Sequence, residues 1–223
     1  MRLTKKIAIL FSGNGSNLEA LIKALHNKRF IKSDKKFQQR KGFLIGGIEN
    51  EFLEVKASNT DSFRVEVVLA LSNKSDAYGL KRAENLGVKT YILESKAYEK
   101  REDFDGALVE ILQKEKIDLC VLAGFMRILT PIFTRQIKAI NIHPSLLPLF
   151  KGAHGIKESF ESKMKLGGVS VHFVNDELDG GEIIAQGVLI KNNESLEEYE
   201  QKIHSLEHFL YPLAVMKVLK GDF

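Results

Sequence analysis

The chain has 223 residues, of which 44% are hydrophobic and 28% are charged, and its formal net charge is +4. This composition is typical of a globular protein of one good-sized domain, and no apolar run reaches the roughly 18 residues of a membrane-spanning helix. The single cysteine, Cys120, excludes an internal disulfide and fits a reducing compartment, so we expect a cytoplasmic protein.

The first half of the chain alternates strands and helices. The apolar run at 6–11 predicts a buried strand, and Leu18, Leu21, Ile22 and Leu25 recur at helical spacing after it. Residues 31–62 lose this periodicity, so we expect an inserted or irregular segment there, with short strands around 43–48. A strand at 65–71, a helix at 76–86 that Gly87 ends, and a strand at 88–93 follow.

The second half continues this alternation and then changes. Apolar positions 104, 108, 111 and 112 predict a helix, and strands are expected at 119–123 and 139–142. Residues 169–174 and 183–190 read as an antiparallel hairpin, and Ser195 with Glu198 forms a capping box that opens a helix to about Lys220. We therefore expect an α/β fold in a single domain, 1–223, with an open, mostly parallel twisted sheet and helices on both faces.

A glycine-rich loop joins the first strand to the first helix. Its glycines let the backbone approach an anion, and the helix N-terminus offers free amide groups, so Gly15, Ser16 and Asn17 are candidates for binding one phosphate. The loop resembles half of a dinucleotide fingerprint, but Leu18 stands at the third glycine position. The strand at 65–71 also lacks the acidic residue that would hold a ribose, so we do not expect NAD.

Three polar side chains form a second constellation. Asn141 and His143 lie at the end of an apolar strand, where open α/β sheets bind ligands, and Asp179 precedes a Gly-Gly turn. An amide, an imidazole and a carboxylate are the groups that can move a proton and stabilise an oxyanion at one carbonyl carbon. Read singly, His143 is also compatible with a loop histidine and Asp179 with a turn residue.

Other patterns carry less information. The stretch from Lys28 to Lys41 is basic, but it lacks a nucleic-acid-binding motif and is typical of a solvated loop, so we expect no nucleic-acid or membrane partner. His204, Glu207 and His208 have the spacing of an inverted zinc-protease signature, but a third ligand is missing, so we expect no metal. Residues 125–129 could begin a helix or form a pocket wall.

Four segments together resemble the phosphoribosylglycinamide formyltransferases, in order along nearly the whole chain apart from 31–62. They are residues 12–17, 123–129, 141–148 and 170–181. The resemblance implies a Rossmann-like formyltransferase fold. It also implies transfer of the formyl group of 10-formyltetrahydrofolate, a co-substrate, to the amine of N1-(5-phospho-D-ribosyl)glycinamide in de novo purine (IMP) biosynthesis.

The resemblance also assigns roles to residues. Gly15, Ser16 and Asn17 would hold the ribonucleotide phosphate, and Glu207 would contact its ribose. Asn141, His143 and Asp179 would be catalytic, with Asp179 favouring the protonated imidazole. The folate site would be lined by the loop 175–179 and by Arg101, Met126, Arg127, Ile128, Leu129 and Asn141.

The chain departs from the family pattern at three places. Residues 31–62 are longer than the usual link and could form a surface flap or a subunit contact. Lys151 and Ala153 resemble the residue pattern of the formyltetrahydrofolate deformylases, and residues 166–168 (Leu-Gly-Gly) replace a more usual His-Gly-Thr sequence. The alternative function is therefore a deformylase, a hydrolase that gives the formyl group to water. A nucleotide-binding module without catalysis is a further alternative, and the chain could be a monomer or a homodimer.

Overall fold

The computed structural model describes residues 4–39, 42–56 and 61–221. Within them, ten strands form one sheet in the order β3-β10-β9-β8-β7-β1-β5-β2-β4, with β6 beside β5. The strands are β1 (Thr4–Phe11), β2 (Arg29–Lys36), β3 (Leu44–Gly46), β4 (Asn50–Glu54), β5 (Phe63–Ser72), β6 (Thr90–Ile92), β7 (Leu119–Leu122), β8 (Ala139–His143), β9 (Leu166–Phe173) and β10 (Ile183–Ile190).

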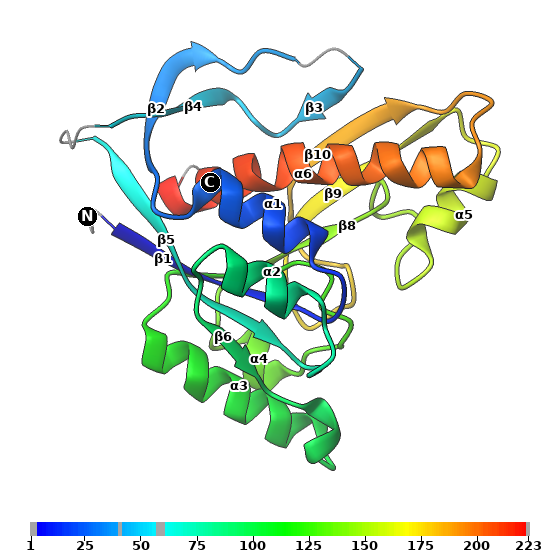
Figure 1. Ribbon diagram of the computed structural model, residues 1–223. Helices are drawn as coiled ribbons and strands as arrows, with labels where there is room; N and C mark the ends of the chain where they lie inside the picture. The colour runs from blue at the N-terminus through cyan, green and yellow to red at the C-terminus, as the bar shows by residue number, and fades with distance from the viewer. Residues whose placement is uncertain (1–3, 40–41, 57–60, 222–223) are drawn as a thin grey trace.

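Helices cover both faces of this sheet (Figure 1). One core lies under the long helix α6 and under α1 and α2, and the other lies under α3 and α4. The helices are α1 (Ser16–Leu25), α2 (Gly79–Asn85), α3 (Arg101–Glu115), α4 (Pro131–Thr134), α5 (Gly155–Glu161) and α6 (Leu196–Lys220), with a 3-10 turn, η1 (Ser95–Ala97). The predicted α/β class with helices on both faces is confirmed.

The parallel part of the sheet explains the position of the candidate site. Strands β6, β5, β1, β7 and β8 run parallel, and β9 and β10 are antiparallel additions after β8. Because parallel strands end at one edge, the segments that follow β1, β7 and β8 meet there.

The capping box predicted at the start of the last helix also forms. The Ser195 N–H donates to Glu198 Oε2 at 2.8 Å, and α6 begins at the next residue.

The segment 31–62 is more regular than its sequence predicts. β2 and β4 pair at one edge of the sheet, whereas β3 pairs with β10 at the opposite edge, and described residues before and after β3 contact α6 (Figure 1). The ring centroids of Phe37 and Phe209 are 6.3 Å apart, and Lys217 Nζ donates to the Gly47 carbonyl at 2.7 Å. These edge strands are polar and half-exposed, so hydrophobic periodicity does not reveal them.

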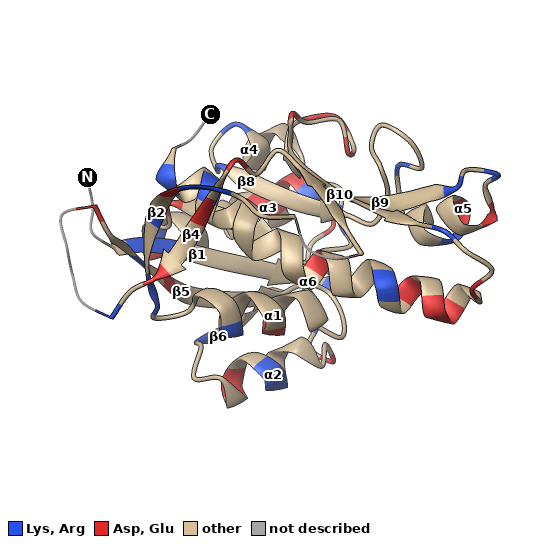
Figure 2. Ribbon diagram, turned by 90° about the horizontal axis from the view of Figure 1, so that it is seen from above, with Lys and Arg blue, Asp and Glu red and all other residues tan. Residues whose placement is uncertain are grey.

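Other boundaries also differ from expectation. The helix predicted at 76–86 is limited to Gly79–Asn85, and the strand predicted at 88–93 to Thr90–Ile92. The short helices α4 and α5 were not predicted, since four and seven residues are too few to show a period. Figure 2 shows basic positions along β2 and acidic positions along the adjacent β4, and Lys28, which precedes β2, forms an ion pair with Glu54 at 3.3 Å.

Candidate active site

The three predicted catalytic residues converge at the end of β8. His143 Nδ1 lies 3.5 Å from Asp179 Oδ2, and both side chains are almost fully buried. The Asp179 backbone has φ 49°, a left-handed conformation that Asp tolerates better than most residues. In addition, the Gly152 N–H donates to Asp179 Oδ2 at 2.9 Å. The turn after β9, which contains Asp179, and the loop after β8, which contains Gly152, therefore both fix the position of this carboxylate.

A fourth polar side chain, His172 on β9, completes the cluster and was not predicted as a site residue. Its Nε2 lies 3.6 Å from Asp179 Oδ1 and 3.3 Å from Asn141 Nδ2. The antiparallel register that pairs Asn141 with His172 brings the two side chains together. His172 could be identified as a site residue only from this register, and the sequence alone does not show how β8 and β9 pair.

Carbonyl neighbours indicate where the protons lie on the two imidazoles. His143 Nε2 is 2.7 Å from the Phe150 carbonyl, and His172 Nδ1 is 2.9 Å from the Phe173 carbonyl. A carbonyl only accepts hydrogen bonds, so each of these nitrogens carries a proton. When His172 is neutral, its Nε2 accepts from the Asn141 amide, whose second N–H stays available for a ligand; when His172 is protonated, Nε2 donates to Asp179 instead. On His143, a proton at Nδ1 would complete a charge-assisted bond to Asp179.

The environment of Asp179 keeps it ionised. Burial on its own would raise the pKa of this carboxyl, but the His172 ring, the Gly152 N–H and the charge that the two imidazoles can carry hold the pKa at about 2. An unfolded Asp titrates near pH ~3.9. The ionised carboxylate therefore stabilises the folded chain above that value, and this contribution is lost as the pH falls towards the folded pKa.

Acid unfolding of Asp179→Asn should reveal this contribution. We expect the difference in free energy of unfolding between wild type and variant to be constant above about pH 5 and to shrink between about pH 4 and pH 2. Urea unfolding at a series of pH values measures it. A difference that grows as the pH falls would contradict the account.

The glycine-rich loop lies at the end of β1 and caps α1. Gly15 has φ 76°, and the first intrahelical bond runs from the Glu19 N–H to the Gly15 carbonyl, so α1 leaves its first N–H groups without an intrahelical acceptor. Asn17 Nδ2 donates to Glu207 Oε2 at 3.1 Å, which joins the predicted phosphate and ribose residues. Glu207 is buried and also accepts from His204 Nδ1 at 2.8 Å, and this bond raises the pKa of His204.

The segment after β7 is an irregular loop, which favours the pocket-wall interpretation of 125–129 over a helix. Met126 and Ile128 are 67% and 54% exposed, so the loop presents apolar side chains to a potential ligand. The Met126 N–H donates to Ser12 Oγ at 2.8 Å, which joins this loop to the glycine-rich one. Arg101 opens α3 and is exposed; among the described residues no hydrogen bond or ion pair joins it to the other candidates.

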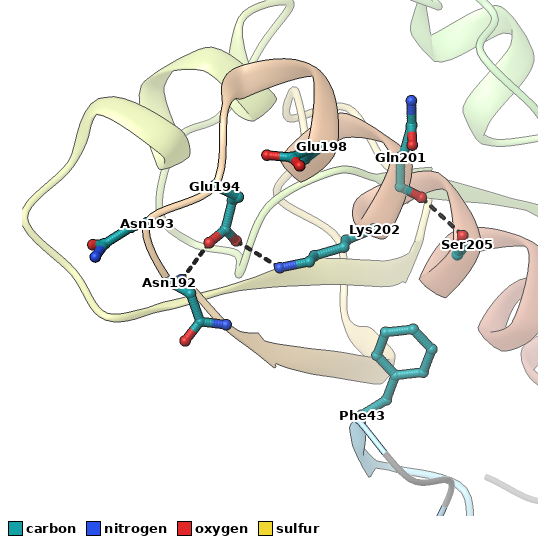
Figure 3. Close-up of a pocket in the computed structure, with 8 residues that line it drawn as sticks. All are labelled: Phe43, Asn192, Asn193, Glu194, Glu198, Gln201, Lys202 and Ser205. Carbon is teal, nitrogen blue, oxygen red and sulfur yellow. Dashed lines mark hydrogen bonds and ion pairs between the residues drawn. The ribbon is translucent and has the colours of Figure 1, made fainter.

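A separate pocket of about 640 Å³ lies outside this cluster (Figure 3). It is lined by Phe43, Asn192, Asn193, Glu194, Glu198, Gln201, Lys202 and Ser205. Lys202 Nζ donates to Glu194 at 3.1 Å, and Glu198 is engaged in the capping box. Since its charged groups already satisfy one another, we place the chemistry at the end of β8 and not in this pocket.

The residues that the structure describes contain no group of three or more histidine, cysteine or acidic side chains arranged to hold a metal ion. None of the helices in the same part of the chain is long and apolar enough to cross a bilayer.

Known proteins resemble this chain in sequence and in structure. The formyl transferase family model matches residues 43–215. The phosphoribosylglycinamide formyltransferase of Escherichia coli is 35% identical over 94% of this chain and 84% of its own length, and that of Bacillus subtilis is 33% identical over 96% and 95%. The crystal structure of the Campylobacter jejuni enzyme of that name is 49% identical, with a TM-score of 0.82 over 98% of this chain and 99% of that one.

Longer relatives contain a matching region as well. The chain spans only 14% and 18% of the trifunctional purine biosynthetic proteins adenosine-3 of Chironomus tentans and Gallus gallus, which are 36% and 37% identical to it. The resemblance that the sequence motifs indicated is thus confirmed over almost the whole chain, and this chain belongs to the formyl transferase family, among the phosphoribosylglycinamide formyltransferases.

Proposed function

We propose that this chain transfers the formyl group of 10-formyltetrahydrofolate to the amine of N1-(5-phospho-D-ribosyl)glycinamide, a step of de novo purine biosynthesis. The observation that carries the proposal is the match to the phosphoribosylglycinamide formyltransferases at nearly full length on both sides. The proposal treats 1–223 as one formyltransferase domain. It also includes a cytoplasmic location, supported by the single buried cysteine.

The cluster at β8 supports a direct transfer. The substrate amine attacks the formyl carbon, which forms a new C–N bond and places negative charge on the formyl oxygen. The bond between the formyl carbon and the folate N10 then breaks, and the formyl group stays on the substrate amine. The free N–H of Asn141 is one donor proposed for that oxygen, and the His143 ring is the other once its Nε2 exchanges the Phe150 carbonyl for the substrate. The amine loses a proton and N10 gains one, and His143 is the group proposed to carry it while Asp179 orients the ring.

The two loops at the same edge are the proposed substrate sites. The phosphate would bind at the N–H groups of Ser16 and Asn17, where the α1 dipole favours an anion, with Glu207 at the ribose. The formyl folate would bind along Met126, Arg127, Ile128 and Leu129, with Asn141 at the formyl end. Arg101 and the 175–179 loop stay in the proposal on the family resemblance alone.

Gly15→Ala should raise the KM for the ribonucleotide by about 10- to 100-fold, because it displaces the loop that holds the phosphate. A Cβ at Gly15 would lie 2.7 Å from Gly79 Cα, and its positive φ is unfavourable for alanine. Gly13→Ala is the matched control, since a Cβ there meets no atom within 4 Å. Steady-state kinetics with each substrate varied measure the effect; equal KM values in the two variants would argue against a phosphate site in this loop.

Product identification distinguishes the transferase from the deformylase, which the relatives do not favour. The chain is incubated with formyl donor and ribonucleotide, and the products are analysed by mass spectrometry. Formylated ribonucleotide supports the proposal. Formate with unmodified ribonucleotide would replace it with the hydrolase.

A further inference from the structure

Buried side chains fix both ends of the segment 126–130, the loop proposed to bind the formyl folate. At its start, the Met126 N–H donates to the hydroxyl of Ser12 at 2.8 Å. At its end, the Thr130 N–H donates to Asp105 Oδ2 at 2.6 Å. Ser12 is 4% exposed and Asp105 is fully buried. The loop backbone is therefore anchored from below, while Met126 and Ile128 point their exposed side chains outward.

Helix α3 also contacts the middle of this loop. The Arg127 guanidinium lies over the Phe104 ring, 4.2 Å from its centroid, and Phe104 immediately precedes Asp105. The first half of α3 thus supports the loop at two points, once through a ring face and once through a carboxylate.

Stability alone does not account for Asp105. A buried carboxyl group costs free energy unless hydrogen bonds compensate it, and its second oxygen, Oδ1, has no hydrogen-bond partner among the described residues. The same holds for Thr130 Oγ1 and Arg127 Nε, so the loop and the helix beneath it are incompletely satisfied. The bond to the Thr130 N–H is the interaction that this carboxyl group does make.

We propose that Asp105 is a positioning residue for the formyl donor: it touches no substrate, but fixes the loop 126–130 in the conformation that binds the folate. This inference rests on the proposed function. It predicts that removal of the Asp105 acceptor weakens binding of the donor and leaves binding of the ribonucleotide unchanged, because the glycine-rich loop is held by other contacts.

The test compares three variants of the full chain. Asp105→Leu fills the same space without an acceptor, and Asp105→Asn keeps an oxygen that can accept from Thr130. Asp103→Ala, two residues earlier on the exposed face of α3, is the matched control. Dissociation constants are measured by fluorescence titration for a stable quinazoline analogue of the folate, and by calorimetry for the ribonucleotide.

We expect Asp105→Leu to weaken binding of the analogue by about 10- to 100-fold, because the Thr130 N–H loses its acceptor and the loop is no longer fixed. Asp105→Asn should stay within about threefold of wild type, and ribonucleotide binding should stay within about twofold in all variants. If Asp105→Leu does not fold, Asp105→Ala removes the acceptor without adding bulk.

Two outcomes would overturn the positioning role while wild type binds both ligands. One is unchanged binding of the analogue in the variant that lacks the acceptor, and the other is an equal loss for both ligands. A wild-type chain that binds neither ligand would instead contradict the proposed function.

Discussion

Replacing His143 with alanine is expected to lower kcat by about 10²–10³-fold, with KM values for both substrates within a few-fold of wild type. The variant loses a donor to the developing oxyanion, which typically has an effect of this size, and it also loses the proposed proton carrier. The imidazole bridges the Phe150 carbonyl and Asp179, so its Nε2 has to leave the Phe150 carbonyl when it acts on the substrate, while Asp179 keeps the ring in place.

The fold should survive this change, because His143 is the last residue of β8 and contributes little apolar burial. Circular dichroism and thermal unfolding check this point. His26→Ala is a suitable control, since His26 contacts the Val67 N–H at the opposite end of α1 from the glycine-rich loop and should leave kcat within about twofold. A folded His143→Ala variant with wild-type kcat would remove His143 from the mechanism.

The second large effect is expected for Asp179→Asn, which should lower kcat by about 10²–10⁴-fold. Asn keeps the size of the side chain and tolerates the left-handed backbone at this position, so the comparison isolates the charge. Without the carboxylate, neither His143 nor His172 has a charged partner.

Glu182→Gln provides the matched control for Asp179, because Glu182 is an exposed carboxylate just beyond the same turn. We expect that control to keep kcat within about twofold. Steady-state kinetics of Asp179→Asn and Glu182→Gln at one pH measure the effect of the charge. Equal kcat values in the two variants would show that the charge at Asp179 is dispensable.

The sequence predicts the parts of the fold that bury continuous apolar runs. The strands that became β1, β5, β7 and β8, and α6 with its Ser195 capping box, were predicted close to their observed bounds. β2 and β4 were missed because they lie at an exposed polar edge, where burial imposes no period. Edge strands of this kind are set by their partners rather than by their own pattern.

The candidate site shows the same limit. Asn141 and His143 were identified because they end an apolar strand, and Asp179 because it precedes a Gly-Gly turn and adds a carboxylate to the amide and the imidazole. His172 looked like any residue of a hairpin strand, and only its register opposite Asn141 places it in the cluster. The role of Asp105 could not be predicted from the sequence either, because its partner, Thr130, lies far along the chain and donates through its backbone N–H.

The central claim is that the formyl group goes to the ribonucleotide and not to water. Its most direct measurement is the absorbance change of folate deformylation, followed with and without N1-(5-phospho-D-ribosyl)glycinamide. We predict turnover only when the ribonucleotide is present, in equal amount to the formylated product. Turnover at the same rate without it would contradict the account and identify a hydrolase.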